Sequence, residues 1–452
     1  MPYRQDIELC RAETIGGAGV SEAALSAELA ALAPALDRLR AACDAGALPA
    51  LTIAGRTDDL AAITETAARL AAHCADVLVL GTGGSALAGR CFTALGREHA
   101  GPRLHFFDSV DPDGFEDALG GIDLAGAGLL IISKSGATAE TLALAFALLP
   151  RLADARGAQA LAETCAVITG PPEPGGADSP LRALAAEMGL AVLDHAPAIG
   201  GRFAAFANVG LLPASLAGIP PQEVRAGASA VLDTLMGEAK AVDIAPALGA
   251  ALTVAIARER GLTQNVMMPY PARLAPFAHW HRQLWAESLG KDAGATTPIA
   301  AQGTADQHSQ LQLWLDGPAD KLFTLIFGRA RGTGPSIAPP AAAGGGADWL
   351  RGRRMGDLMA ASQAATRDVL AAKGRPVRVI EVARADGRTL GALMMHFMVE
   401  TILAGDLLGV DPFGQPAVEA GKARARETLA AMAAEPAAAK GCPKGRHKDG
   451  RP

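Results

Sequence analysis

The sequence predicts an α/β protein built from two doubly wound, mainly parallel sheets in tandem, with helices at both ends of the chain. Its 452 residues exceed what one hydrophobic core usually serves, and half of them are apolar, so two domains are expected. Short apolar runs typical of buried strands alternate with longer helical stretches in both halves of the chain. This alternation indicates parallel sheets that are covered by helices on both faces.

The elements follow one another in a regular order. Residues 1–75 are expected to be helical, most clearly from Ser21 to Ala42, where apolar side chains recur at helical spacing. The strands expected in the first sheet are 77–80, 104–107, 128–132, 165–169 and 190–193. The second region is expected to contain strands 265–269, 321–327 and 377–382 and helices 203–217, 222–239, 243–260, 348–372 and 389–408.

These elements suggest where the domains begin and end. The expected parts are an N-terminal helical segment 1–75, a first domain 76–198, a second domain 199–412, a C-terminal helix 413–434 and a tail 435–452. The tail is rich in Ala, Gly, Pro, Lys and Arg, a composition that predicts disorder at a chain end.

Charge and composition argue against several classes of protein. Lys and Arg total 41 against 47 for Asp and Glu, so the net charge of −6 offers no long-range attraction to nucleic acid or to an anionic membrane. No apolar run reaches the ~18 residues of a membrane span, and Met1 to Arg11 lacks the apolar core of a signal peptide. The six cysteines show no spacing typical of zinc. A cytoplasmic protein with reduced thiols and no metal site is expected.

Two turns after predicted strands have a composition suited to binding an anion. Gly81-Thr-Gly-Gly-Ser85 lets the backbone approach a ligand closely and adds the Ser85 hydroxyl, although such a sequence equally suits a simple tight turn. Ser133-Lys-Ser-Gly-Ala-Thr138 places three hydroxyls at a strand–helix junction, where they and free N–H groups suit a phosphate dianion. The alternative is that Ser135 or Thr138 merely caps the helix.

Glu287 is a candidate proton-transfer group near the end of an amphipathic helix that Gly290 terminates. Burial beside Leu284 and Trp285 would raise its pKa toward that of a useful base. The alternative is a surface Glu that pairs with Lys291, four residues further on.

Three other side chains are candidates on their residue type and setting. His308 lies at a loop-to-helix entry, where it either shuttles protons near neutral pH or is an exposed capping residue. Lys422 is a lone helical lysine, which is usually solvated. Arg202 follows two glycines that give its backbone room to approach a ligand, and its planar guanidinium suits an anionic oxygen.

Taken together and in order, these segments resemble the glucose-6-phosphate isomerase family over nearly the whole chain. The matching segments are Gly81–Ser85 for the first sugar-binding loop, Ser133–Thr138 with Lys134 for the phosphate loop, Ile199-Gly-Gly-Arg-Phe203 for the Gly-Gly-Arg-aromatic signature, Ala286–Asp292 for the segment with the catalytic Glu, Gln307–Ser309 for the His, and Gln415–Lys422 for the closing signature.

The chain departs from the family at three positions beside these segments. Ala204 stands where Ser or Thr is usual, Gly414 where Asp is common, and Ala417 where Gly is common. None of these three residues replaces an expected functional residue, so the expected activity is unchanged. They are expected to affect the rate of turnover and the range of substrates. The chain is also short for the family, so insertions found in longer members must be missing.

The resemblance implies two sugar-isomerase domains of αβα type and the interconversion of glucose 6-phosphate and fructose 6-phosphate, in glycolysis and gluconeogenesis, through a cis-enediol or enediolate without metal or cofactor. It implies that Glu287 is the base, that His308 with Lys422 opens the sugar ring, and that Arg202 stabilises the enediolate. The implied binding residues are Gly84, Ser85, Ser133, Lys134, Ser135, Thr138 and Gln415. A homodimer in which His308 reaches the partner's site is also implied.

Other functions are open to a protein of this fold. An isomerase of wider scope would also accept mannose 6-phosphate, and a non-catalytic sugar-phosphate-binding regulator would use the same domains. The regulator would need a DNA-binding module or a damaged base position, and neither is visible in the sequence. A kinase or a dehydrogenase lacks support because the chain has no G-x-x-x-x-G-K-[ST] motif and no complete dinucleotide fingerprint. The sequence favours the isomerase.

Overall fold

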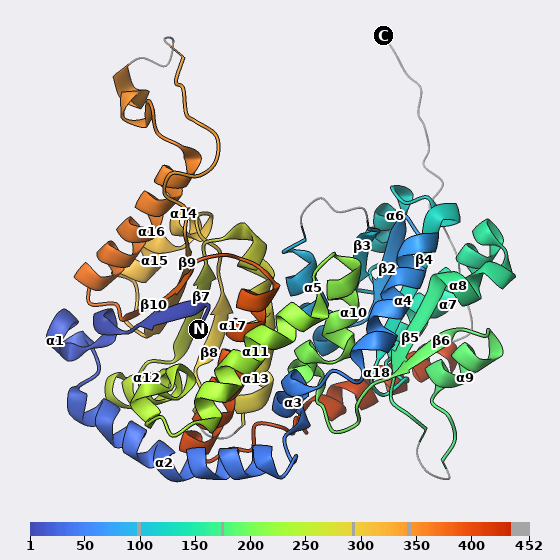
Figure 1. The fold of residues 1–452 in the computed structure, drawn as a ribbon, viewed down its shortest axis with the longest axis horizontal. Helices are drawn as coiled ribbons and strands as arrows, with labels where there is room; N and C mark the ends of the chain where they lie inside the picture. Colours follow the sequence, from blue (N-terminus) through green and yellow to red (C-terminus); the bar gives the residue numbers. More distant parts are fainter. Residues whose placement is uncertain (97–100, 173–175, 292–293, 341–344, 435–452) are drawn as a thin grey trace. The chain divides into compact units, whose positions relative to one another are not determined.

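The computed structural model describes residues 1–96, 101–172, 176–291, 294–340 and 345–434 (Figure 1). The chain forms two compact units, Met1–Pro412 and a second unit that begins at Phe413. Both sheets belong to the first unit, and the second contains the helix α18 (Val418–Ala434). The predicted disordered tail, 435–452, lies outside the described residues.

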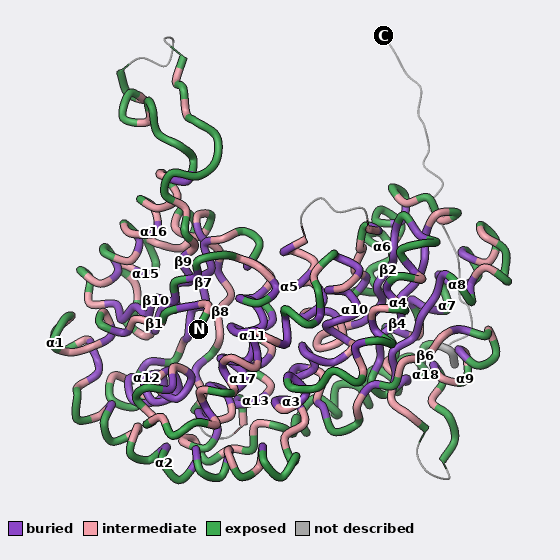
Figure 2. The backbone as a smooth tube through the Cα atoms, viewed as in Figure 1, coloured by how far each residue is buried: buried purple, intermediate pink, exposed green. Residues whose placement is uncertain are grey.

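The first sheet contains five parallel strands in the order β3-β2-β4-β5-β6. They are β2 (Asp76–Leu80), β3 (Arg103–Phe107), β4 (Ala127–Ser133), β5 (Cys165–Thr169) and β6 (Ala191–Asp194). All five were predicted. Every residue of β2, β4 and β5 is buried (Figure 2), which explains why they read as continuous apolar runs.

Helices cover both faces of this sheet. Val79 and Ile132 belong to the same apolar core as α4 (Leu60–His73), α5 (Leu87–Thr93) and α10 (Asn208–Leu216), and Leu80 and Ile131 share the other core with α7 (Ala139–Arg156) and α9 (Pro180–Glu187). The remaining helices of this half are α3 (Pro49–Thr52), α6 (Pro112–Gly120) and α8 (Leu161–Thr164). The predicted αβα arrangement of the first sheet is confirmed.

The second sheet has the order β1-β10-β9-β7-β8, parallel except for β1. Its strands are β1 (Tyr3–Asp6), β7 (Gln264–Pro269), β8 (Thr297–Ala300), β9 (Lys321–Gly328) and β10 (Val377–Val382). The edge strands β1 and β8 were not predicted. Each has four residues, β1 is mostly polar and β8 contains Pro298, so neither gives the apolar run of a buried strand.

Helices also cover the second sheet. One side carries α2 (Glu22–Asp44), α11 (Pro221–Met236), α12 (Ala245–Arg260), α13 (Ala275–Leu289) and α17 (Gly387–Leu408), and the other helices of this half are α1 (Ala12–Ile15), α14 (Asp306–Ser309), α15 (Leu311–Asp316) and α16 (Met355–Ala372). Among the described residues, α17 alone is long and apolar enough to cross a membrane, and 89% of its apolar window is buried inside the protein. It is the core helix of this half.

The predicted bounds of the helices 348–372 and 203–217 need correction. The predicted helix 348–372 begins only at Met355, because Gly352 adopts a left-handed φ of 72° and Arg354 forms the cap of α16. The predicted helix 203–217 is divided at Ala207, whose extended backbone separates a 3₁₀ turn, Gly201–Phe206, from α10. That turn keeps the Gly-Gly-Arg signature outside the regular helix.

Candidate active site

Both anion-binding candidates lie at the carboxyl edge of the first sheet, after the paired strands β2 and β4. The sheet order reverses between these two strands, which is where open α/β sheets bind ligands. The two turns begin next to each other, because a Cβ added to Gly81 would lie 3.1 Å from the carbonyl oxygen of Ile132, the residue before the second turn. The structure therefore brings the two turns together.

The hydroxyl groups of the second turn form one cluster. The Oγ atom of Ser133 lies 3.0 Å from Thr138 Oγ1, and Ser135 Oγ lies 3.5 Å from the same atom. Thr138 occupies the N-cap position of α7, but its side chain makes no capping hydrogen bond. Gly136 has a φ of 60°, and a Cβ there would lie 2.0 Å from Ser179 Oγ, so the turn requires glycine. Capping does not explain the Thr138 hydroxyl.

The Lys134 side chain in this turn is exposed, yet partial loss of hydration lowers the pKa of its ammonium group. Its backbone carbonyl accepts a hydrogen bond of 3.0 Å from the amide of Gly170, the residue after β5. The turn is thus attached to the next strand while its lysine points outward.

Gly84 brings the first turn against the Gly-Gly-Arg signature. A Cβ on Gly84 would lie 2.3 Å from the carbonyl carbon of Gly201, so the contact leaves no room for a side chain at Gly84. Arg202 follows directly. The glycines therefore set the close approach of two segments that are more than a hundred residues apart in the sequence.

Arg202 links the signature to Glu287. Its side chain is only 3% exposed, and it donates from Nη1 to Glu287 Oε2 at 3.3 Å. It also donates from Nε to Ser288 Oγ at 2.8 Å and from Nη2 to the Pro412 carbonyl at 2.6 Å. Burial lowers the pKa of the guanidinium, and the Glu287 carboxylate opposes that shift. The Glu287 side chain stays 27% exposed, so its carboxylate is reachable from solvent.

Gln283 and Ser288 complete this cluster, and the sequence interpretation assigned neither of them a role. Gln283 donates from Nε2 to Glu287 Oε1 at 2.8 Å, and the same nitrogen would lie 2.8 Å from a Cβ on Gly83. The i, i+4 spacing from Gln283 to Glu287 could have revealed the first contact. No sequence pattern points to the Ser288 contact. The alternative pairing of Glu287 with Lys291 is not formed, because Lys291 instead donates to the Asp411 carbonyl.

His308 lies away from this cluster in the same chain. It is on α14, beyond the carboxyl end of β8, where the Tyr270 hydroxyl donates to the neighbouring Gln307 at 3.0 Å. Glu287 instead lies near the amino end of β8, since Trp285 Nε1 donates to the Thr296 carbonyl at 3.2 Å. The two residues thus lie at opposite edges of the second sheet, and the 15-residue helix α13 between those edges is about 22 Å long.

Gln415 and Lys422 belong to the second unit. Lys422 lies in the first turns of α18, is 56% exposed, and donates to Glu419 Oε1 at 2.7 Å. Within its own unit this lysine therefore has the solvated character usual for a helical lysine.

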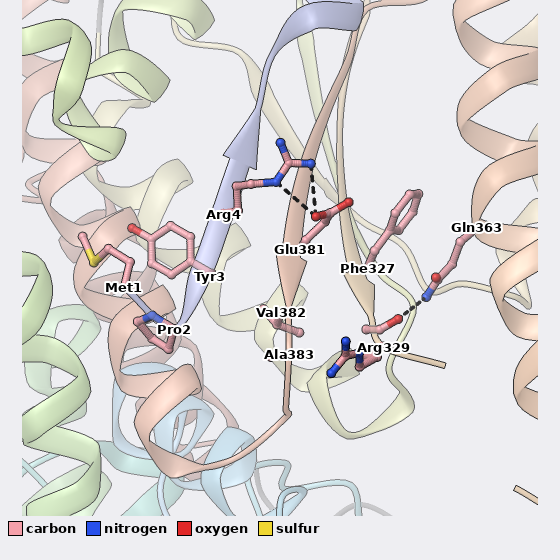
Figure 3. A pocket seen from close by; sticks show the side chains of 11 residues that line it. Met1, Pro2, Tyr3, Arg4, Phe327, Arg329, Gln363, Glu381, Val382 and Ala383 are labelled. Atoms are coloured by element: carbon pink, nitrogen blue, oxygen red, sulfur yellow. Dashed lines mark hydrogen bonds and ion pairs between the residues drawn. The ribbon is translucent and has the colours of Figure 1, made fainter. Parts of the chain in front are cut away.

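A separate hollow lies at the carboxyl edge of the second sheet. It measures about 540 Å³, and Figure 3 shows Arg4 paired with Glu381 on one side and Gln363 on the other. None of the sequence-predicted site residues lines it. Among the described residues, no three His, Cys, Asp or Glu side chains are grouped closely enough to hold a metal ion.

Comparisons with known proteins relate most of the chain to one family. A family model described as phosphoglucose isomerase matches residues 65–318. A probable glucose-6-phosphate isomerase of Halobacterium salinarum is 43% identical over 325 residues, covering 72% of this chain and 73% of its own. The glucose-6-phosphate isomerase of Rubrobacter xylanophilus is 37% identical over 355 residues, covering 77% and 81%.

Two solved structures share the fold. A hypothetical protein from Thermus thermophilus superposes with a TM-score of 0.82 at 30% identity, covering 95% of this chain and 100% of its own. A glucose-6-phosphate isomerase from Chlamydia trachomatis gives a TM-score of 0.69 at 23% identity, covering 86% and 79%. This chain therefore shares its two-sheet α/β fold with that isomerase. Within that fold class, the chain belongs to the phosphoglucose isomerase family.

Proposed function

We propose that this protein interconverts glucose 6-phosphate and fructose 6-phosphate in the cytoplasm, with Glu287 as the base. The observation that carries the proposal is the contact of Glu287 with the buried Arg202, beside a glycine turn that adjoins a cluster of three hydroxyls. The names of the relatives support this substrate pair. The cysteines among the described residues are free and buried, as expected in a reducing compartment.

Glu287 takes a proton from the carbon next to the carbonyl and returns it to the neighbouring carbon through a cis-enediol or enediolate. Both of its oxygens are held, Oε1 by Gln283 and Oε2 by Arg202, so the carboxylate keeps one orientation during both transfers. A carboxylate suits this role because the same group accepts and delivers the proton. The reaction is redox-neutral overall, and the proposal includes no metal or cofactor.

Arg202 stabilises the negative charge that develops on the enediolate oxygens. Its guanidinium is held in place before the reaction by Glu287, Ser288 and the Pro412 carbonyl. Donors that are held in this way need not reorganise as charge develops, and removing one such donor typically costs about 10²–10³-fold in rate.

The first sheet binds the rest of the substrate. Gly84 and Ser85 contact the sugar, and Lys134 and the hydroxyls of Ser133, Ser135 and Thr138 hold the 6-phosphate. This phosphate does not react, so its binding energy serves to orient the sugar at Glu287.

His308 and Lys422 open the sugar ring, and Gln415 contributes to binding. His308 lies at the opposite edge of the second sheet from Glu287 of its own chain. In a homodimer with a two-fold axis, each site can draw on a residue of the other chain. We therefore propose a homodimer in which His308 acts in the partner's site.

The test is an assay of glucose 6-phosphate formation from fructose 6-phosphate in EDTA, followed by a coupled dehydrogenase. Glu287→Gln is expected to lose at least ~10³-fold in kcat, as for removal of an essential catalytic group. The control is Glu381→Gln, which removes a half-exposed carboxylate paired with Arg4 and should keep full activity. Tight binding of a sugar-phosphate analogue without any turnover by the wild type would instead support a regulator.

The same assay with mannose 6-phosphate tests the wider substrate scope. Ala204 is the departure from the family nearest to Arg202 in the sequence, and its side chain is fully buried. Discrimination between the two aldoses depends on the shape of the pocket around carbon 2. Turnover of mannose 6-phosphate within about tenfold of glucose 6-phosphate would assign the protein to the wider class.

A further inference from the structure

Two cationic side chains hold two successive carbonyl groups at the end of the first compact unit. Arg202 Nη2 donates to the Pro412 carbonyl at 2.6 Å, and Lys291 Nζ donates to the Asp411 carbonyl at 2.5 Å. Pro412 is the last residue of that unit. Asp411 and Pro412 are therefore both held just before the segment that contains Gln415 and Lys422. Pro412 is held by Arg202, which also contacts Glu287, and Asp411 is held by Lys291, four residues after Glu287.

Residues 409–412 are also held by packing against the end of α13. Helix α17 ends at Gly409, which has a φ of 71°, and the Val410 amide then donates to the Gly405 carbonyl at 2.9 Å. A Cβ on Gly405 would lie 3.4 Å from Leu289 Cδ2 and 3.5 Å from Pro412 Cβ. The turn after α17 thus lies against the end of α13, the helix that carries Glu287.

The positive charge of the Lys291 ammonium is disfavoured by burial and by the nearby charge of Arg202. Burial lowers its pKa, the nearby Arg202 guanidinium lowers it further, and Asp411 acts in the opposite direction. Two cations near each other are unfavourable unless each has its own acceptor. The Pro412 and Asp411 carbonyls supply those acceptors, and Arg202 has the Glu287 carboxylate as well.

We propose that Lys291 is a positioning residue for the ring-opening step: it anchors Asp411 and thereby fixes where the segment from Phe413 to Lys422 begins. The inference rests on the proposed function, since it gives Gln415 and Lys422 their roles. Gln415 follows Pro412 by three residues, a length of chain that spans at most about 11 Å. Anchoring Asp411 reduces the conformations open to this short connection, and with them the entropy lost when its side chains are placed for reaction.

The anchor is tested first without measuring activity. The Lys291→Met protein is digested with trypsin under native conditions, and cleavage after Lys422, Arg424 and Arg426 is followed by mass spectrometry. Loss of the anchor is expected to raise the cleavage rate at these sites about tenfold, because local opening becomes easier. The control is Lys373→Met, which removes an exposed pair with Asp316 and should leave the rate unchanged.

Kinetics then tests the link to catalysis. Lys291→Met is expected to lower kcat about tenfold with KM within about twofold, because the groups that bind the phosphate remain in place. Lys291→Arg keeps a donor and should retain kcat within about threefold. If Lys291 acts through Lys422, the double variant Lys291→Met/Lys422→Met should be no slower than Lys422→Met alone, whereas independent effects would multiply.

The outcomes separate the anchor from the proposed function. An unchanged cleavage rate, an unchanged kcat, or multiplying losses in the double variant would each overturn the positioning role. A wild-type protein that binds sugar phosphates without isomerising them would refute the proposed function instead. In that case the trypsin result still shows whether Lys291 holds the segment.

Discussion

Two of the arginine–carboxylate pairs in the described residues, Arg378–Glu400 and Arg202–Glu287, differ in how far water reaches them. Arg378 and Glu400 are both fully buried, and Nη1 of the arginine donates to both carboxylate oxygens at 2.9 Å. Arg202 is almost as enclosed, but it donates a single hydrogen bond of 3.3 Å to Glu287, whose side chain is 27% exposed. We call Arg378–Glu400 the closed pair, because water reaches neither side chain, and Arg202–Glu287 the open pair, because the Glu287 side chain is partly exposed.

The groups around each pair extend this difference. His396 Nε2 lies 2.9 Å from Glu400 Oε2, and His396 Nδ1 lies 2.6 Å from the Tyr3 hydroxyl, so the closed pair joins α17 to β10 and β1. Burial would raise the pKa of Glu400, but Arg378 and His396 outweigh it and keep that pKa below its ordinary value. The comparison teaches that the carboxylate proposed as the base is the one that remains accessible, while the enclosed pair links elements of the fold.

Removing one partner of the closed pair should have the largest effect. Glu400→Gln leaves the Arg378 charge buried without a counter-ion, so the free energy of unfolding is expected to fall by about 3–5 kcal/mol. Urea unfolding measures it, with Glu116→Gln in an exposed pair as a control that should lose less than about 1 kcal/mol. The activity per folded molecule should be unchanged. A loss of kcat in the folded fraction would contradict the structural role.

Arg202→Met tests the Arg202–Glu287 pair, where we expect a large loss of activity and a smaller loss of stability. We expect kcat/KM to fall by about 10²–10³-fold, because a donor to the developing enediolate is lost. The unfolding free energy should fall by less than in Glu400→Gln, since the Glu287 carboxylate that loses its partner remains partly hydrated. A variant that is strongly destabilised but normally active when folded would show that Arg202 is structural.

The pH dependence of stability provides a third, smaller test. His281 is fully buried near Arg378 and Glu400, its ring nitrogens have no partner among the described residues, and burial lowers its pKa to about 3. In the unfolded chain the pKa of a histidine is about 6.5. As the pH falls from about 6.5 toward 3, the unfolded state therefore binds the proton first and stability is lost, by up to about 1.4 kcal/mol per pH unit.

His281→Phe removes this titrating group and keeps a ring of similar shape. Unfolding in urea at several pH values is expected to show a shallower loss of stability than in the wild type between about pH 6 and pH 4. Equal slopes in the two proteins would show that His281 does not stay neutral in the folded state.

The smallest effect is expected from removing the C-terminal tail, residues 435–452. Truncation after Ala434 removes the residues rich in Ala, Gly, Pro, Lys and Arg, and the rate of isomerisation should stay the same. A large loss on truncation would assign the basic tail a role in the reaction.

Much of the fold could be predicted because its strands are apolar on both faces. The five strands of the first sheet and three of the second form short apolar runs, whereas β1 and β8 are recognisable only once their neighbours are in place. The closed pair left no such signal. Arg378 is one of two polar residues in β10 and Glu400 one of two acids in α17, and only the packing of α17 on β10 brings them together.

The sequence predicted the local motifs of the candidate site but not the contacts between residues that are distant in the chain. The glycine turns and the hydroxyl-rich turn are local, so their composition alone indicated them. The contact of Arg202 with Glu287 joins residues 85 positions apart, and only the family resemblance suggested it. The Lys291 anchor could not be predicted, because its acceptor is a backbone carbonyl that has no sequence signature.

Proton exchange during turnover tests the central claim, that Glu287 moves a substrate proton, most directly. Fructose 6-phosphate is converted in D₂O, and the product is examined by NMR for deuterium at carbon 2 of glucose 6-phosphate. We predict that the wild type incorporates solvent deuterium, because the proton held by Glu287 can exchange, and that Glu287→Gln gives neither product nor exchange. Isomerisation or exchange that persists at the wild-type rate in Glu287→Gln would contradict the account, whereas wild-type turnover with little deuterium means that Glu287 returns the proton before it exchanges with solvent.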